Sequence, residues 1–341
     1  MASVIDLSTK FDFTVEQLSS VKELVYEGII TSPELSLFTT IFPGIMYDKE
    51  IGFVGGGGML GVAGQGCNPT PQEWSIATRK VTWTPKSWEV YVVQCWTDLE
   101  ATIAVFSLKS GISRPDFSES DYMNIVVDFL IQGIKDMMMR LAFFGDTDAG
   151  VSKPHFNWMD GFFKQMVMQY TIDSNQHVTI SENAGTSYAL QALPSTNIQS
   201  YLQSLISQAD PELMQMQGNV IICTRSFYNA YKLSLQGLGL PETYMNLTTG
   251  KNELMYDGYP IYPVDTWDSI IRANYDNGTK WVNPHRAIFT NPSVLAIGVD
   301  DEGSFRNTEV WYNKDTRQVK FLAMGQMDAK LANPKLFVYA V

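Results

Sequence analysis

Residues 118–145 read SESDYMNIVVDFLIQGIKDMMMRLAFFG, and this stretch decides the fold. Its apolar residues recur every three or four positions, the spacing of one face of an α-helix; they are Met123, Val126, Val127, Leu130, Ile134, Met137, Met138 and Leu141. Ser118–Asp121 is typical of a helix start and Gly145 of a helix end. Such a helix would be about 40 Å long at ~1.5 Å per residue, which predicts a rigid spine.

Upstream of this helix, residues 43–100 are strand-like around a glycine-rich centre. The run 55–66 reads GGGGMLGVAGQG; Ile51–Val54 precedes it, and Trp74–Trp83 and Trp88–Trp96 follow it. The two later runs alternate in the manner of half-buried strands. An isolated hairpin is marginal in water because it has little core of its own. We therefore expect a long two-stranded ribbon with a loose glycine tip that lies on another surface.

The first 42 residues are interpreted as a weakly amphipathic arm. After Thr14, a residue type favoured at helix N-caps, apolar side chains fall at helical spacing; they are Leu18, Val21, Leu24 and Val25. The segment is too short to form a domain alone. We expect the body of the protein or a neighbouring chain to cover its apolar stripe.

Downstream of the spine, strands alternate with helices as in a compact α/β unit of about 100 residues. The expected helices lie at 160–166, after Pro194, and at 226–236, and the expected strands at 218–224, 256–264 and 286–290. An Asp-Gly turn at 257–258 precedes the second of these strands. The end of the chain is expected to form a hairpin of 309–312 with 318–324 and a last strand at 336–341, pinned into a sheet.

Composition limits the classes of function. Of 341 residues, 45% are hydrophobic and 18% charged, so the chain can bury a sizeable core and has room for about two domains. A net charge of −12 argues against a grip on nucleic acid, which needs clustered Lys and Arg. The same charge would suit a container for DNA, or simply keep a protein soluble. No signal peptide is expected, because the first residues, MASVID, lack a cationic region ahead of an apolar stretch. No membrane span is expected, because charged residues interrupt 122–144.

We expect no catalytic residue, cofactor or metal. Residues 56–61 formally match GxGxxG, but the residues after them cannot form the helix whose N-terminus would hold a pyrophosphate. Solvated loop positions are expected for the scattered histidines, His155, His177 and His285. Free thiols are expected for Cys67, Cys95 and Cys223.

Two acidic groups fall in turns that contain glycine. They are Asp146 with Asp148, and Asp300 with Asp301 and Glu302. Turn chemistry explains both groups, because short acidic side chains bond to their own backbone. Calcium binding is the alternative, although the spacing of an EF-hand is missing.

The order of arm, glycine-tipped ribbon, spine helix, α/β unit and returning strands resembles the major capsid proteins of tailed double-stranded DNA phages. This is the Hong Kong 97-type fold, which encapsulins and herpesvirus capsid floors share. The residues that carry the resemblance are RLAFFGD at 140–146, DGYPIYP at 257–263, and FTNPSVLAIG at 289–298 leading into VKFLAMG at 319–325.

The resemblance implies an α+β fold in four parts. These are an N-terminal arm (1–42), an extended β-hairpin loop (43–100), a discontinuous peripheral domain with the spine helix (101–192 and 291–341), and an axial α/β domain (193–290). Contacts with neighbouring subunits are implied for the arm residues Leu18, Val21, Leu24 and Val25. They are also implied for the loop tip, Gly55, Gly56, Gly57, Gly58, Met59 and Leu60.

The implied function is structural and not enzymatic. Subunits would assemble in the host cytoplasm into pentamers and hexamers of an icosahedral virion shell that encloses double-stranded DNA without sequence-specific binding or a membrane. Portal and scaffolding proteins, and a decoration protein, are the implied partners. Some members of that family crosslink a loop lysine to a neighbour's asparagine. Lys49 lies in the first strand of the loop, but no asparagine and glutamate partner is identifiable, so the resemblance is not extended to this chemistry. An encapsulin-type compartment shell and an α/β enzyme with an unread site are the alternatives.

Overall fold

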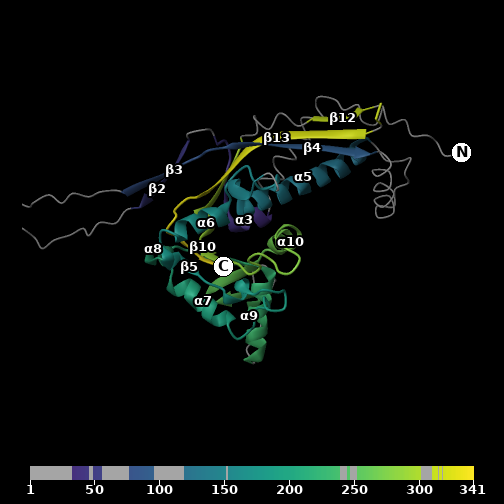
Figure 1. Cartoon of the computed structure of the whole chain (residues 1–341). Coiled ribbons are helices and arrows are strands. Elements are labelled where there is room, and N and C mark those ends of the chain that lie inside the picture. Colours follow the sequence, from purple (N-terminus) through teal and green to yellow (C-terminus); the bar gives the residue numbers. More distant parts are fainter. Residues whose placement is uncertain are drawn as a thin grey trace, which may run out of the picture.

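The computed structural model describes residues 33–45, 49–55, 77–95, 119–150, 153–238, 244–245, 252–300, 309–313, 315–316 and 318–341. Figure 1 shows two parts: long strands over the helix α5 (Glu119–Phe144), and below them a compact α/β unit. Among the described residues, no helix combines the length and apolar character needed to cross a membrane.

Helix α5 confirms the predicted spine and ends where glycine allows a close turn. A side chain at Gly145 would place its Cβ 2.6 Å from the backbone oxygens of Leu141 and Met159. Gly161 faces it from the next segment, and its N–H donates to the Gly145 carbonyl at 2.8 Å. The chain can therefore double back tightly into α6 (Phe162–Tyr170), the predicted second helix.

The upper sheet is organised by β13 (Gln318–Leu331), which spans about 46 Å at ~3.3 Å per residue. One edge of β13 pairs with β4 (Lys86–Cys95) over ten residue pairs. The other edge pairs first with β12 (Glu309–Asn313), as the predicted hairpin, and then with β11 (Leu295–Val299). A short strand, β1 (Thr40–Phe42), follows α3 (Pro33–Phe38) and extends the sheet in parallel beside β11.

The placement of β4 corrects one expectation. The run 88–96 was predicted within the glycine-tipped ribbon, but β4 leaves that ribbon and pairs along β13. This pairing buries Trp88 over Gly325, where a Cβ would come within 2.7 Å of the indole ring. A free ribbon offers no comparable cover for a tryptophan, so the longer pairing is favoured.

The lower unit is built on a second mixed sheet, in the order β5-β14-β10-β6-β9-β8-β7. Its described strands are β5 (His177–Val178), β6 (Val220–Cys223), β7 (Tyr244–Met245), β8 (Asn252–Tyr256), β9 (Tyr259–Pro263), β10 (Ala287–Thr290) and β14 (Phe337–Ala340). The predicted Asp-Gly turn joins β8 to β9, with positive φ at both residues. The last strand is pinned in the sheet, as predicted.

The central strands β6, β10 and β14 are buried on both faces, so this sheet separates two cores. Ile222 and Ile288 face α5, α6 and α10 (Asp265–Asn274). The neighbouring residues Ile221 and Phe289 face α7 (Ile198–Ser207) and α9 (Arg225–Gly237), the two helices predicted for this unit. Helix α10 and the short α8 (Pro211–Gln215) were not predicted.

The contact between the two glycines gives a paired test of this packing. Gly161→Ala should destabilise the chain by about 1–3 kcal/mol, because its Cβ would lie 2.7 Å from backbone atoms of Leu141 and Gly145. Gly133→Ala, within α5 and with no atom within 4 Å of the added Cβ, should stabilise it by about 0.5–1 kcal/mol. Urea unfolding measures both; equal midpoints for the two variants would refute the packing.

Candidate interaction site

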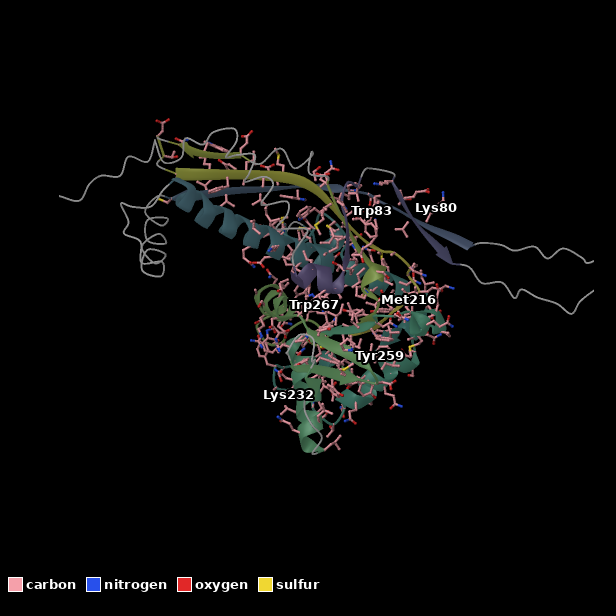
Figure 2. All side chains as sticks on the ribbon, turned by 180° about the vertical axis from the view of Figure 1, so that it is seen from behind. Lys80, Trp83, Met216, Lys232, Tyr259 and Trp267 are labelled. Carbon is pink, nitrogen blue, oxygen red and sulfur yellow. The ribbon has the colours of Figure 1, made fainter. Side chains whose placement is uncertain are left out.

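A two-stranded ribbon projects from the body of the protein (Figures 1 and 2). It consists of β2 (Glu50–Gly55) and β3 (Ala77–Thr82), paired antiparallel from Glu50 opposite Thr82 to Gly55 opposite Ala77. The two strands form a sheet of their own. An ion pair between Lys80 and Glu50, 2.6 Å long and exposed, contributes little stability. The ribbon therefore depends on its root or on an external surface.

The ribbon flanks the glycine-rich run, as the sequence predicts. Of the predicted tip contacts, Gly55 ends β2, while Gly56, Gly57, Gly58, Met59 and Leu60 lie outside the described residues. The predicted arm contacts, Leu18, Val21, Leu24 and Val25, also lie outside them.

Trp83 anchors the root of the ribbon. Its side chain is 1% exposed and packs with Ile45, Ala296 and Ala332. The Trp83 backbone N–H donates to the Lys49 carbonyl at 3.0 Å. Gly298 leaves room for this cluster, since a Cβ there would lie 2.7 Å from Ile45 and 3.0 Å from the Trp83 ring. The direction in which the ribbon leaves the body is therefore fixed by packing.

A buried carboxylate ties the next residue to β13. Asp328 accepts from the Thr84 backbone N–H at 2.6 Å, and Lys330 Nζ donates to the Thr84 hydroxyl at 2.9 Å. Burial raises the pKa of Asp328, although the hydrogen bond from Thr84 and the charge of Lys330 oppose that shift. The two bonds hold the point where the chain leaves the ribbon and enters β4.

The outer part of β4 carries exposed apolar side chains. Tyr91 is 50% exposed and stacks on Trp311 of β12 with ring centroids 6.2 Å apart. Val92 and Val93 are also exposed. Among the described strands, β4 pairs with β13 alone. This end of the upper sheet therefore offers apolar surface and a strand edge.

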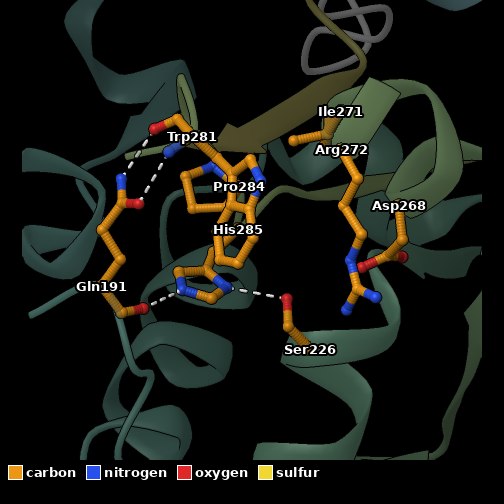
Figure 3. Close-up of a pocket in the computed structure, with 8 residues that line it drawn as sticks. All are labelled: Gln191, Ser226, Asp268, Ile271, Arg272, Trp281, Pro284 and His285. Carbon is orange, nitrogen blue, oxygen red and sulfur yellow. Dashed lines mark hydrogen bonds between the residues drawn. The ribbon is translucent and has the colours of Figure 1, made fainter. Parts of the chain in front are cut away.

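A pocket of about 60 Å³ lies in the lower unit (Figure 3). His285 lines it and is only 5% exposed, which corrects the predicted solvated position. Its Nδ1 lies 2.7 Å from Ser226 Oγ, and its Nε2 lies 2.5 Å from the Gln191 carbonyl oxygen. Of the other histidines, His155 is exposed as predicted. His177 lies in strand β5, half-buried against the Tyr170 ring, which also corrects the predicted solvated loop position.

The geometry of this pocket favours a structural role over hydrolysis. A Ser–His pair that attacks a carbonyl needs N–H donors free to face the developing oxyanion. The N–H of Arg225, at the start of α9, instead donates to the Asp268 carboxylate at 2.7 Å. The second imidazole nitrogen faces a backbone carbonyl. Unlike the carboxylate of a catalytic triad, a carbonyl carries no full negative charge that would stabilise the protonated ring.

The acidic turn at Asp146 and Asp148 is explained by a lysine. Lys164 Nζ lies 2.8 Å from each of these carboxylates and 2.9 Å from Asp160. Burial alone would lower the pKa of Lys164, but the hydrogen bonds to the carboxylates raise it. The ammonium thus occupies the centre that the calcium alternative needs. Within the described ranges, no cluster of three metal-ligating side chains occurs.

Two cysteines are described, and Cys223 is a free thiol as predicted. Cys95 is exposed at the end of β4, and Cys223 is buried in β6. Burial raises the pKa of the Cys223 thiol, which keeps it protonated and unreactive. Cys67 lies outside the described residues.

Neither a protein-family model nor a curated protein sequence matches the chain, but solved structures do. A chain of the satellite phage P4 procapsid matches with a TM-score of 0.57 and 11% identity, over 94% of this chain and 97% of that one. One from Gordonia phage Cozz matches at 0.52 and 11%, over 90% and 85%. One from the capsid of an empty GTA particle matches at 0.52 and 9%, over 90% and 88%.

The chain has a phage-capsid fold. The matches span nearly all of it, so this capsid fold includes the upper sheet, α5 and the lower unit together. The predicted resemblance is confirmed at the level of the fold. The finer division into arm, loop, peripheral and axial parts stays a prediction. One fact bears on it: β14, from the segment 291–341, pairs with β10 of the lower unit.

Truncation of the anchor tests the root of the ribbon. Trp83→Ala should destabilise the chain by about 3–5 kcal/mol and release the ribbon, because the cluster loses its largest side chain. Limited proteolysis should then cut within 49–82 at a protease dose that leaves the wild type intact. Trp83→Phe keeps an aromatic ring in the site, so its stability and its cleavage should lie between those of the wild type and those of Trp83→Ala. Unchanged cleavage in Trp83→Ala would contradict the anchoring role.

Proposed function

We propose that this chain is the major capsid protein of a Hong Kong 97-type shell. Copies assemble with themselves into pentamers and hexamers of an icosahedral particle that encloses double-stranded DNA. The observation that carries the proposal is the β2–β3 ribbon, which is rooted firmly but projects away from its own body (Figure 1). A capsid fold over nearly the whole chain supports it.

The ribbon and arm are the proposed contacts between subunits. A two-stranded ribbon alone is marginal, so its tip, Gly55–Leu60, gains stability by lying on a neighbouring copy. The arm residues Leu18, Val21, Leu24 and Val25 cover a neighbour in the same way. In this proposal residues 1–42 are the arm, 43–100 the extended loop, 101–192 with 291–341 the peripheral domain, and 193–290 the axial domain.

The net charge suits a shell that encloses DNA better than a protein that binds it tightly. At −12 the chain repels phosphate groups, so DNA is enclosed without a sequence-specific grip. The role is structural, which the blocked geometry beside Ser226 supports. Assembly takes place in the host cytoplasm and the product is the virion capsid. A portal, a scaffolding protein and a decoration protein are the proposed further partners.

Electron microscopy of the purified chain tests self-assembly. We expect closed shells, or capsomers with five- and six-fold symmetry. A monomer that persists at high concentration would refute the proposal. Met59→Asp with Leu60→Asp should abolish shells and leave the unfolding midpoint of the monomer unchanged, because charges at the tip oppose burial on a neighbour. A control with the same added charge on exposed α7 positions, Gln203→Asp with Ser207→Asp, should still assemble.

The contents of particles from the native source separate a virion from an encapsulin-type compartment. A capsid should contain DNA that resists added nuclease until the shell is opened. Particles that hold an enzyme and no DNA would favour the compartment. Catalytic turnover by the empty, purified chain would instead favour the enzyme alternative.

A further inference from the structure

Two segments of the lower unit, 181–193 and 275–285, are joined by polar contacts and are here called the clasp. Gln191 binds Trp281 twice: its Nε2 donates to the Trp281 carbonyl at 2.7 Å, and its Oε1 accepts from the Trp281 N–H at 3.0 Å. Tyr188 donates its hydroxyl to Asp276 at 2.5 Å. Gln191 is buried, so opening the clasp would expose amides that are now satisfied.

His285 lies where the clasp meets the start of α9 (Figure 3). Its backbone N–H donates to Asn183 Oδ1 at 3.0 Å, and its carbonyl accepts from Asn183 Nδ2 at 2.8 Å. A carbonyl can only accept, so the imidazole Nε2 must carry a proton and donate to Gln191. Nδ1 then accepts from the Ser226 hydroxyl. The neutral ring satisfies both of its nitrogens in this arrangement.

We infer that His285 is a proton-sensitive latch, which closes the clasp when neutral and releases it when acid protonates the ring. A second ring proton would make Nδ1 a donor, so the Ser226 hydroxyl would have to turn away and accept instead. The proton would also place a positive charge among buried groups, which is costly without a partner of opposite charge. The pocket of about 60 Å³ beside the ring is large enough to hold water, so protons can reach it.

Among the described residues, no carboxylate is hydrogen-bonded to the ring, whose partners are Ser226 and the Gln191 carbonyl. From the clasp itself, the negative charge of Glu182 favours a protonated ring, but its hydrogen bonds come from Tyr201 and Asn197 and the burial of His285 outweighs its effect. From α10, Asp268 accepts from Arg225 of α9, and Arg272 adds a positive charge to the pocket lining. The guanidinium of the neighbouring Arg286 lies against the rings of Phe144 and Phe163. Asp276 and Lys280 belong to the clasp, and Asp276 is bound to Tyr188.

The expected pH dependence follows from the direction of each shift. Burial lowers the pKa of His285, so the closed clasp favours the neutral ring. Its stabilising effect is complete above the ordinary histidine pKa of about 6.5 and is lost as the pH falls below that value. Burial raises the pKa of Asp268, so its protonation favours the closed form in acid and acts in the opposite sense. Hydrogen bonds lower the pKa of Glu182 and of Asp276, which therefore stay ionised near pH 5.

Hydrogen exchange of the full-length chain at pH 7.5 and 5.0 tests the latch, with each rate divided by the intrinsic rate at that pH. Coupling to one proton should increase opening of the clasp by up to about 30-fold. Peptides from 181–193 and 275–285 should show this loss of protection. Peptides from β13 should change little. His285→Gln, which cannot gain the charge, should remove the response, and His285→Asn is the second neutral variant.

The other histidines provide the control that leaves the latch intact. His177 is half-buried near the clasp, and burial lowers its pKa as well. A chain with His155→Gln and His177→Gln keeps His285 as its sole histidine and should keep the full response. Loss of the response in this variant would overturn the proposal. Equal protection of the wild-type clasp at both pH values, or an unchanged response in His285→Gln, would overturn it too.

Discussion

The rest of the fold depends on the pairing of β13 with partners on both of its edges. The strand carries β4 along one edge and β12 and then β11 along the other. The β4–β13 pairs join segments more than 200 residues apart, so the N-terminal and C-terminal parts of the chain form one layer. Helix α5 lies beneath that layer (Figure 1). The ring of Trp88 on β4 packs against Gly325 of β13, so side-chain packing on one face also holds these two strands together.

The β2–β3 ribbon is fixed to that layer at its root. Its root is packed at Trp83 and bonded at Thr84, while its far end carries glycine-rich sequence. A packed root that continues into a two-stranded sheet is suited to contact with a second molecule. The capsid fold comes from comparison and the rooted ribbon from packing, and the proposed assembly rests on both.

Local pattern in the sequence predicted the elements but not all of their partners. The spine helix, the buried strands and the Asp-Gly hairpin follow from periodicity and turn chemistry, and all three occur. Alternation marked 88–96 as a strand, yet nothing local identifies β13 as its partner. Helix α10 had a signal that was missed, with Trp267, Ile270 and Ile271 at helical spacing. The buried position of His285 could not be predicted, because Asn183, Gln191 and Ser226 meet it only in the folded chain.

The central claim is that the ribbon of one subunit lies on another copy of the chain. A cryo-EM map of assembled particles, resolved well enough to trace residues 50–82, tests this most directly. The account predicts density for Gly55–Leu60 against the surface of a neighbouring subunit, with the root still packed at Trp83. A ribbon that folds back onto its own subunit, or particles in which the tip touches no neighbour, would contradict it.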